Sequence, residues 1–577
     1  MNIRMTPGRR PPGRRGKASA LLTGWLLAAL ALSGAQAADE PAFTVVEASI
    51  ADMQAAMASG RTTSEAIVRQ YLDRIERYEP KLHATLATNP DALAQARALD
   101  KERAEGKVRS PLHGIPIALK DNIHTTDMPT TGGALAFKDY VPPYEATLVS
   151  RLEAAGAIIL AKTTLTELAN WVATGMPNSY NAVRGYGYNP YDPRPDPREG
   201  FNDGRAVLDT GGSSSGIGTA ANFWAANVGT ETSGSIQIPS NNTRLAAIKP
   251  TVGRVSRHGI IPITADQDTA GPMAKFVADA AKLLAAMEGA DSEDPATGNC
   301  PALPAGLAES LSADSLEGAR IGIPRAFFYD AVTPPGAESS VGGLSAAEAA
   351  VMARALAILK AQGAVIVDPA DLPSVVAKDP DDNQLLFGNC YDLPQGKGGD
   401  ANCSVMLKYG MKRDFNLWLD SLGDTAPVDS LTGLREFNLA HRDQNAIRYD
   451  QAELDISDEM DAEKDKARWR ADRDKDIRLS RTEGIDAALT AHELDALFIP
   501  SWRSENILNK AGYPAVIVPF AEVPSELDPP LPDGFDPQPM PFGVTFIGTA
   551  CSEPRLIELA YAFEQASGGR RPPAAFP

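Results

Sequence analysis

Two short stretches of the chain gather glycine and hydroxyl residues that could take part in catalysis. The first is GGSSSG at 211–216, and the second is GTETSGSIQIPS at 229–240. Such stretches are typical of solvated linkers. They are also typical of catalytic loops, in which backbone N–H groups reach a substrate without side chains in the way. A serine in such a loop becomes a nucleophile when a nearby base takes its proton.

The common partners of a catalytic serine are not indicated. The pattern G-x-S-x-G fits 212–216 with Ser214 at its centre, but it requires a buried strand just before it, and the preceding residues are polar. None of the six histidines lies in an apolar loop late in the chain. The patterns S-x-x-K, G-x-x-x-x-G-K-[ST] and H-E-x-x-H are absent, which argues against an S-x-x-K acyl-serine enzyme, a P-loop and a zinc protease.

A lysine is the remaining candidate for the base. Lys120 ends the apolar run of PIALKDNI, which predicts a buried strand that runs into a turn. Burial disfavours the charged form and brings a lysine toward a neutral amine, which a general base requires. The alternative is a structural lysine whose ammonium reaches the sheet edge or pairs with Asp121.

Several motifs, in this order, resemble those of the amidase signature family. They are GIPIALKDNI, DTGGSSSG, GTETSGSI, AAIKPTVGRVSRHGIIP and DQDTAGPMA, followed near the end by AGYPAVIVP and PFGVTFIG. The resemblance covers residues 45–290 and 490–575 and is loose over 300–485. Within the family, the motifs are most similar to those of the secreted peptide amidases.

The resemblance implies a Ser–cis-Ser–Lys catalytic set without a metal or an organic cofactor. Carried over by motif, Ser235 is the nucleophile, Lys120 the base and Ser213 the bridging serine in a cis peptide. The spacing from 213 to 235 is shorter than is usual in the family, so Ser214 and Ser215 stay open as the bridge.

Further site residues are implied by the same resemblance. The N–H groups of Thr232, Ser233 and Gly234, with that of the nucleophile itself, are expected to form an oxyanion hole. The segment ATGMPNSYN at 173–181 is expected to line the acyl pocket, and a structural turn is the alternative. Its predicted substrate contacts are Gly175, Met176 and Asn178.

The implied activity is hydrolysis of an amide to an acid plus ammonia or amine through an acyl-serine intermediate. A C-terminal peptide amide is the favoured substrate. Two alternatives are the glutamine-hydrolysing subunit of a tRNA-dependent amidotransferase and a non-catalytic binding protein on an amidase scaffold. Intact residues at the three catalytic positions argue against the latter.

The first 37 residues predict a signal peptide. Six basic residues and no acidic one precede and flank the apolar run ALLTGWLLAALAL, and AQA at 35–37 offers a cleavage site after Ala37. The alternative is an uncleaved anchor. Cleavage changes the net charge from −19 to −25, because six positive charges leave. A polyanion of this size argues against nucleic-acid partners and anionic membrane surfaces, and the sequence predicts a periplasmic or secreted enzyme.

Four cysteines, none in a C-x-x-C pattern, do not predict a zinc site. Export permits disulfides, and Cys390 and Cys403 flank a glycine-rich loop that a disulfide could close. Buried free thiols are the alternative.

Short apolar, β-branched runs between helical patterns predict an α/β protein with a largely buried sheet. The resemblance adds that the sheet is large and mixed, with helices on both faces. The predicted domain is 38–577, with a charge-rich helical insertion around 380–485 whose helix near 458–478 is expected to be solvent-exposed. Capping boxes are expected at Thr62 and Glu65 and at Ser345 and Glu348.

Overall fold

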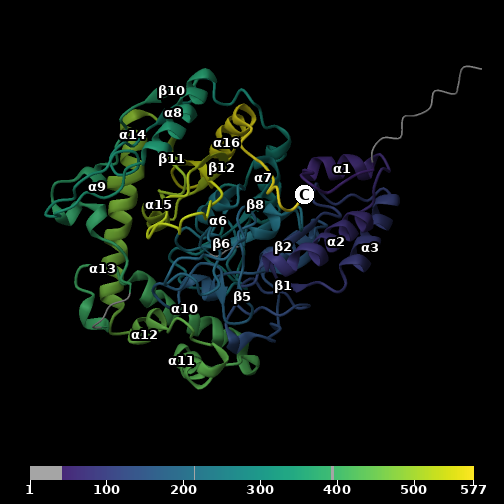
Figure 1. Ribbon diagram of the computed structural model, residues 1–577, viewed down its shortest axis with the longest axis horizontal. Helices are drawn as coiled ribbons and strands as arrows, with labels where there is room; N and C mark the ends of the chain where they lie inside the picture. Colours follow the sequence, from purple (N-terminus) through teal and green to yellow (C-terminus); the bar gives the residue numbers. More distant parts are fainter. Residues whose placement is uncertain (1–41, 213–214, 392–395) are drawn as a thin grey trace, which may run out of the picture. The chain divides into compact units, whose positions relative to one another are not determined.

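The described residues form an 11-stranded mixed sheet, which runs through the unit Thr44–Pro577 (Figure 1). The computed structural model describes residues 42–212, 215–391 and 396–577. The strand order is β1-β3-β2-β6-β8-β7-β12-β13-β11-β9-β10. The predicted fold class, a large mixed α/β sheet, is confirmed.

The bounds of these strands follow the chain. They are β1 Thr85–Thr88, β2 Pro116–Lys120, β3 Ile158–Thr163, β6 Ala226–Glu231, β7 Ala246–Lys249, β8 Thr269–Ala274, β9 Arg320–Gly322, β10 Val365–Val367, β11 Ala496–Pro500, β12 Ala515–Val523 and β13 Met540–Ile547. A separate hairpin pairs β4 Tyr180–Asn181 with β5 Gly185–Tyr186.

The strands β2 and β6 lie next to each other in the interior of the sheet, and every residue in both is buried. Successive side chains of a strand point to opposite faces, so both faces of the sheet are covered here. The two strands run parallel, with Leu119 opposite Val228. Their C-terminal ends, Lys120 and Glu231, therefore lie at the same edge of the sheet.

Sixteen α-helices occur in the described chain. They are α1 Ile50–Ala58, α2 Ser64–Leu82, α3 Ala92–Ala104, α4 Thr147–Ala154, α5 Ile217–Ala220, α6 Gln237–Asn242, α7 Val277–Met287, α8 Ala346–Ala361, α9 Pro373–Val376, α10 Met406–Leu422, α11 Leu431–Ala440, α12 Ala452–Asp458, α13 Lys466–Ile477, α14 Asp486–His492, α15 Glu505–Ala511 and α16 Glu553–Ser567. The helix α16 packs on β12 and contacts α7 and α8.

Two helix starts were expected to carry capping boxes. The prediction at Ser345 and Glu348 is confirmed at the start of α8. The prediction at Thr62 and Glu65 is wrong by one residue. The N-cap of α2 is Thr63, whose side chain accepts from the N–H of Ala66.

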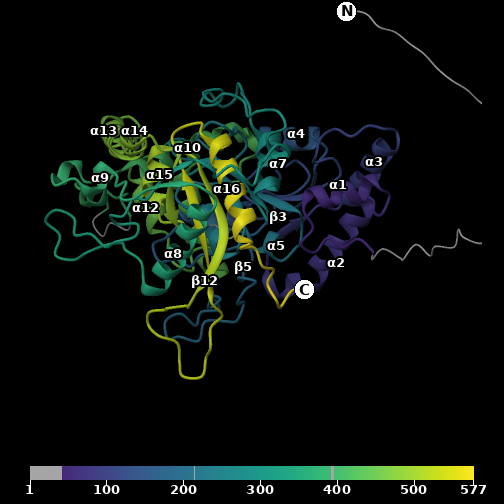
Figure 2. The same ribbon diagram turned by 90° about the horizontal axis from the view of Figure 1, so that it is seen from above.

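The surface loop between β12 and β13 projects from the sheet beside the loop 191–209 (Figure 2). Arginine side chains from the second loop hold the first. Arg198 donates to the carbonyls of Asp528 and Pro529, and Arg194 donates to that of Asp536.

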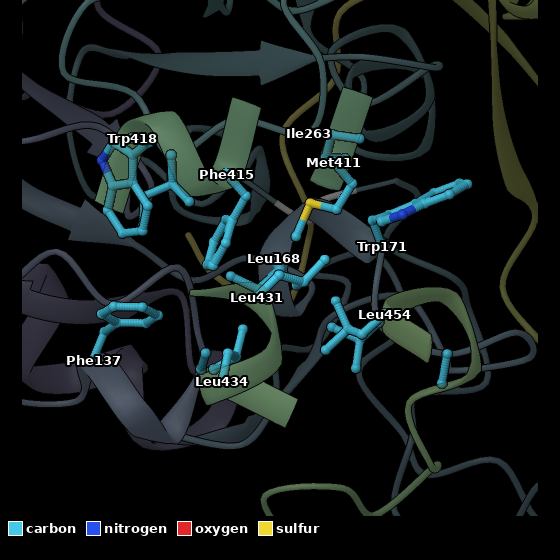
Figure 3. Close-up of a cluster of buried hydrophobic side chains, with 14 of the residues drawn as sticks. Phe137, Leu168, Trp171, Ile263, Met411, Phe415, Trp418, Leu431, Leu434 and Leu454 are labelled. Carbon is cyan, nitrogen blue, oxygen red and sulfur yellow. The ribbon is translucent and has the colours of Figure 1, made fainter. Parts of the chain in front are cut away.

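The helical insertion shares a hydrophobic core with the segment 168–176 (Figure 3). Trp171 belongs to this core together with Met411 of α10 and Leu454 of α12. The indole N–H of Trp171 also donates to Ser457 Oγ at 2.9 Å. The insertion is therefore packed against the chain that precedes the hairpin β4–β5.

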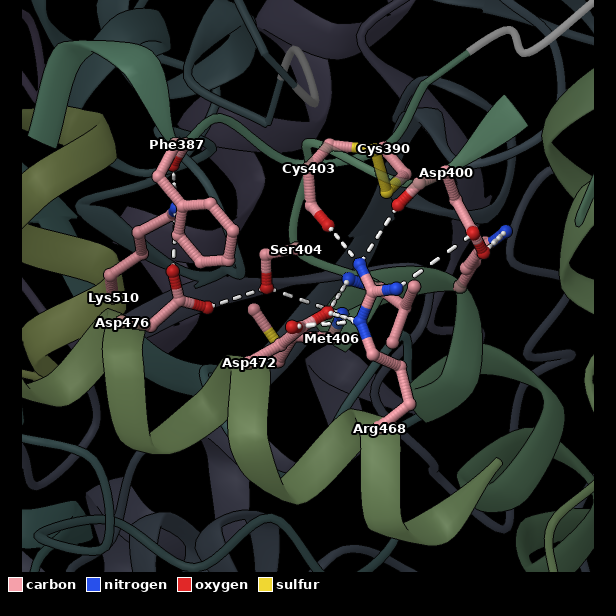
Figure 4. Close-up of a disulfide and its surroundings, with 12 residues drawn as sticks. Phe387, Cys390, Asp400, Cys403, Ser404, Met406, Arg468, Asp472, Asp476 and Lys510 are labelled. Carbon is pink, nitrogen blue, oxygen red and sulfur yellow. Dashed lines mark hydrogen bonds and ion pairs between the residues drawn. A yellow bond between two sulfur atoms is a disulfide. The ribbon is translucent and has the colours of Figure 1, made fainter. Parts of the chain in front are cut away.

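The expectation that the helix near 458–478 is simply solvent-exposed is wrong for one of its faces. Asp472 and Asp476 of α13 are buried. Asp472 accepts from the N–H of Val405, and Asp476 accepts from Ser404 Oγ and pairs with Lys510 at 2.7 Å (Figure 4). These carboxylates are buried because each has donors to satisfy it.

In the described part of the chain, no helix is both long and apolar enough to span a bilayer. Within the same residues, no group of three or more His, Cys, Asp and Glu side chains is arranged to hold a metal ion.

Candidate active site

Lys120 is fully buried at the end of β2 and reaches the neighbouring strand. Its Nζ donates to Thr230 Oγ1 at 2.7 Å and to the Thr230 carbonyl at 3.1 Å. Asn122 Nδ2 donates to the same hydroxyl at 3.0 Å. A neutral amine has two N–H groups, so Thr230 can satisfy both and leave the lone pair of Nζ free to accept a proton.

The alternative role of Lys120, a pair with Asp121, is not observed. The carboxylate of Asp121 lies 3.3 Å from Lys162 Nζ, and both side chains are buried. Asp121 also accepts from the N–H of Thr131. A second buried lysine thus neutralises Asp121, and no carboxylate of the described residues is bonded directly to Lys120.

Burial lowers the pKa of Lys120 from its ordinary value to about 7, because a charged ammonium loses its hydration there. The carboxylates of Asp268 and Glu231 act in the opposite direction. The lowered pKa makes the neutral amine available near neutral pH.

Ser235 lies in the turn between β6 and α6, and Glu231 braces that turn. Glu231 Oε2 accepts from the N–H groups of Ile236 at 2.7 Å and Gln237 at 2.9 Å. Its Oε1 accepts from Gln237 Nε2 at 2.7 Å. The last residue of the strand therefore fixes the chain on the far side of the serine.

Two glycines allow close approach around Ser235. A Cβ placed on Gly212 would lie 2.9 Å from Ser235 Cα, and one on Gly234 would lie 2.5 Å from Ile238 Cδ1. Gly234 has a φ of 85°, in the region that favours glycine. The glycine at 212 thus has a steric cause in the contact between the two loops, and the glycine at 234 has one in a contact within its own loop.

Ser213 and Ser214, two candidates for the bridging serine, lie outside the described residues, and so does the expected cis peptide at Ser213. The third candidate, Ser215, is placed away from Lys120. Its Oγ contacts Met273 Sδ at 3.3 Å and lies 3.2 Å from where a Cβ on Gly229 would be. Because residues 229 and 230 of β6 point to opposite faces, this hydroxyl and the Lys120–Thr230 contact lie on opposite faces.

Ser235 opens onto a cavity of about 250 Å³. Of the predicted oxyanion-hole residues, Thr232 and Ser233 line it, and Gly234 lies between Ser233 and Ser235. Within the described chain, the N–H groups of Ser233 and Gly234 donate to no other residue. No histidine occurs among the described residues that line the cavity.

The comparisons with known proteins agree with this geometry. A family profile described as Amidase matches residues 66–380. A probable amidase from Arabidopsis thaliana is 32% identical over 541 residues, which cover 92% of each chain. The chain belongs to the amidase signature family. It is an amide-hydrolysing enzyme, which contradicts the alternative of a non-catalytic binding protein on an amidase scaffold.

Two further proteins resemble this amidase over nearly its whole length. The native peptide amidase of Stenotrophomonas maltophilia, a crystal structure, is 36% identical with a TM-score of 0.75, covering 91% of this chain and 98% of that one. A glutamyl-tRNA(Gln) amidotransferase subunit from Synechococcus is 30% identical over 549 residues, covering 91% of this chain and 99% of its own.

The three predicted substrate contacts are placed differently. Asn178 lines the Ser235 cavity. Gly175 and Met176 line a neighbouring cavity of about 290 Å³, to which Asn178 also contributes. Met176 is 7% exposed and belongs to the hydrophobic core of the insertion. The amidase thus brings one of the three residues to the Ser235 cavity.

The remaining cavity wall comes from distant segments. Ala169, Asn170 and Trp171 contribute one part, and Leu168, Ala169 and Asn170 all have positive φ, a strained arrangement that clusters at functional sites. Tyr391 and Leu407 come from the insertion. The ring of Tyr391 lies 5.5 Å from that of Trp171.

A disulfide fixes the chain beside Tyr391. Cys390 is bonded to Cys403, with their Cα atoms 5.1 Å apart (Figure 4). A second disulfide joins Cys300 to Cys551. Of the two alternatives that the sequence left open for Cys390 and Cys403, the disulfide is therefore the one present. Arg468 supports it by donating to the carbonyl of Cys403 at 3.0 Å.

Sequence reasoning missed several residues of this site. Thr230 and Glu231 belong to the quoted motif GTETSGSI, and Asn122 follows Lys120 in PIALKDNI, so a search for polar neighbours of the lysine could have found them. Tyr391 and Glu505 lie in segments with no recognisable pattern. Only the fold brings them to the cavity.

Replacing Gly212 by alanine should disable the amidase. The added Cβ would meet Ser235 Cα at 2.9 Å, so Ser235, the predicted nucleophile, must shift. A displacement near 1 Å costs about 100-fold in rate, and we expect kcat/KM for amide hydrolysis to fall at least that far. The control is Gly388→Ala, whose Cβ meets nothing within 4 Å. Equal activity of the two variants would contradict the close contact.

Removing the two disulfides separately should have different effects. Cys390→Ser with Cys403→Ser frees the wall at Tyr391, and KM should rise about threefold to tenfold because binding must then order that wall. Cys300→Ser with Cys551→Ser should leave KM unchanged.

Melting temperatures should change in the opposite order: loss of the Cys300–Cys551 disulfide should lower the melting temperature more than loss of the Cys390–Cys403 disulfide. The Cys300–Cys551 disulfide spans 251 residues and the Cys390–Cys403 disulfide 13. In the chain-entropy account these loops correspond to about 5 and about 3 kcal/mol. A KM change confined to the Cys300/Cys551 variant would show that the Tyr391 wall does not depend on its disulfide.

Proposed function

We propose that this chain is an exported amidase that hydrolyses C-terminal peptide amides through an acyl-serine intermediate. Ser235 is the nucleophile, Lys120 the general base and Ser213 the bridging serine, with Ser214 as its alternative. The proposal rests above all on one observation. A fully buried lysine, with a pKa of about 7, sits at the same sheet edge as a serine that opens onto a cavity.

The proposed reaction begins with two proton transfers. The neutral Nζ of Lys120 takes the proton of the bridging serine, which takes the proton of Ser235 Oγ. The Ser235 oxygen then attacks the amide carbonyl carbon. The N–H groups of Ser233 and Gly234, which donate to no other described residue, would stabilise the oxyanion together with those of Thr232 and Ser235.

Breakdown of the tetrahedral intermediate breaks the C–N bond. The proton held by Lys120 returns through the bridging serine to the leaving nitrogen, which departs as ammonia. A water molecule then attacks the acyl-serine, with the same relay as base, and releases the acid. Each proton removed by Lys120 is returned, so no co-reactant other than water is needed.

The peptide-amide assignment is supported by the 36% identity to a peptide amidase over 91% of this chain. The main alternative, a glutamine-hydrolysing amidotransferase subunit, is kept by the 30% identity to such a protein. A predicted signal peptide and a predicted mature charge of −25 favour the first, because the second works with tRNA, a polyanion.

Lys120 should set the acid limb of the pH profile. Catalysis needs the neutral amine, so kcat/KM should fall as the pH drops through about 7 and the amine gains a proton. Lys120→Met, which has similar length and no base, should fold normally and lose about 10³-fold in kcat/KM.

Three controls isolate this effect. Burial also raises the pKa values of Asp268 and Glu505 to about 7, so Asp268→Asn and Glu505→Gln should be profiled and should keep the acid limb. A fluorophosphonate should label the wild type rapidly, Lys120→Met far more slowly, and Ser235→Ala not at all. Near-normal activity of Lys120→Met, with its acid limb intact, would place the base elsewhere.

The export proposal predicts a processed chain. Protein purified from the native host should begin at Ala38 and be recovered outside the cytoplasm. N-terminal sequencing and fractionation check this. A mature protein that starts at Met1 in the cytoplasmic fraction would reject the signal peptide.

A further inference from the structure

Glu505 is the one charged residue among the described residues that line the Ser235 cavity. The other described lining residues are apolar or uncharged polar side chains, and none is a lysine or an arginine. Nothing in the proposed catalytic relay uses this carboxylate. A charged group that faces a substrate cavity without a role in the chemistry needs another explanation.

The carboxylate lies against the turn that carries the nucleophile. Ser233 Oγ donates to Glu505 Oε2 at 3.0 Å. A Cβ on Gly234 would lie 3.5 Å from the Cβ of Glu505. The charge of Glu505 is therefore next to the turn 232–235, where the reacting carbonyl must lie.

The helix that presents Glu505 is firmly held. Lys510, at the other end of α15, is buried, pairs with Asp476 at 2.7 Å and donates to the carbonyl of Phe387 (Figure 4). The ammonium of Lys510 is thus paired with the carboxylate of Asp476, and Lys510 does not line the cavity. Glu505 keeps its position, and none of the described residues that line the cavity supplies a cation to neutralise it.

We propose that Glu505 determines substrate specificity by charge. It admits neutral and cationic amides, discriminates against amides that carry a carboxylate close to the scissile group, and weakens binding of the carboxylate product. This inference rests on the proposed function, because it takes the Ser235 cavity as the place where the amide is cleaved.

The chemistry of the reaction gives this charge a purpose. A neutral carboxamide enters the cavity, and a carboxylate is left in the same place after hydrolysis. Two like charges a few ångströms apart in a poorly hydrated cavity repel each other strongly. Glu505 therefore repels the carboxylate product but not the neutral substrate. This repulsion favours release of the acid.

The same charge bears on the rival function. Glutamine presents an α-carboxylate, and a cavity built for it would be expected to offer a cation. The described lining offers a carboxylate instead. The inference thus names the substrate class as amides without a neighbouring free carboxylate.

The test uses two substrates that differ by one carboxylate, N-acetyl-leucinamide and N-succinyl-leucinamide. Ammonia release is measured at pH 8, where Glu505, with a pKa of about 7, is mostly ionised. The wild type should prefer the acetyl substrate by about tenfold or more in kcat/KM. Glu505→Gln, which still accepts from Ser233, should reduce this preference to about threefold or less, mainly by gain on the succinyl substrate.

Product inhibition is the second readout. The inhibition constant of N-acetyl-leucine should fall about tenfold in Glu505→Gln, because the repulsion is removed. Asp533→Asn is the matched control, since it removes the same charge from an exposed residue of the loop between β12 and β13. It should change neither readout. Glu505→Asp, which keeps the charge, should retain the preference.

The outcomes separate the two proposals. If the wild type releases ammonia neither from these two substrates nor from other neutral peptide amides, the proposed function fails. If it hydrolyses the acetyl substrate but Glu505→Gln changes neither the preference nor the product constant, the role of Glu505 is overturned. Should Glu505→Gln melt well below wild type, Glu505→Met decides the matter as a second uncharged variant.

Discussion

The site depends on the burial of one amine. An ammonium loses its hydration when it is buried, and this cost lowers the pKa of Lys120 to about 7. The cost is tolerated because β2 and β6 are adjacent parallel strands, which place the Thr230 hydroxyl and carbonyl within 2.7 and 3.1 Å of Nζ. A free carboxylate at that distance would hold the proton on the lysine. Asp121, the nearest one along the chain, is instead paired with Lys162.

Close backbone approach is the second constraint. The two glycine- and serine-rich loops leave different parts of the chain and meet at Ser235, where a Cβ on Gly212 would lie 2.9 Å from the serine Cα. Glu231 then fixes the turn from behind with three hydrogen bonds. The strand end, the turn and the facing glycine form one unit around Ser235.

The sequence motifs predicted this unit but not the segments that surround it. The apolar run PIALK predicted β2, and other short apolar, β-branched runs predicted a largely buried sheet, because buried strands leave a continuous apolar signal. The strands β6, β7 and β8 gave no such signal, since Asn227, Lys249 and Thr269 lie buried among small residues. The N-cap of α2 is Thr63 and not the predicted Thr62, because the sequence pattern does not distinguish between two neighbouring threonines. The buried face of α13 was not predicted. In the sequence alone, Asp472 and Asp476 have the pattern of solvated charges, because hydrogen-bond donors to both lie on other segments.

The cavity wall is assembled differently from the unit around Ser235. Its residues come from the strained turn 168–170, from Asn178, from Tyr391 and Leu407 in the insertion, and from Glu505 on α15. No local pattern marks these positions, because each one is defined by a tertiary contact. Some are held by structures of their own, such as the disulfide beside Tyr391 and the Lys510–Asp476 pair behind Glu505. A chain can therefore keep the buried amine and the serine turn while its wall changes. In the proposed mechanism the contiguous motifs therefore set the reaction type, and single residues that the fold brings to the Ser235 cavity select the substrate.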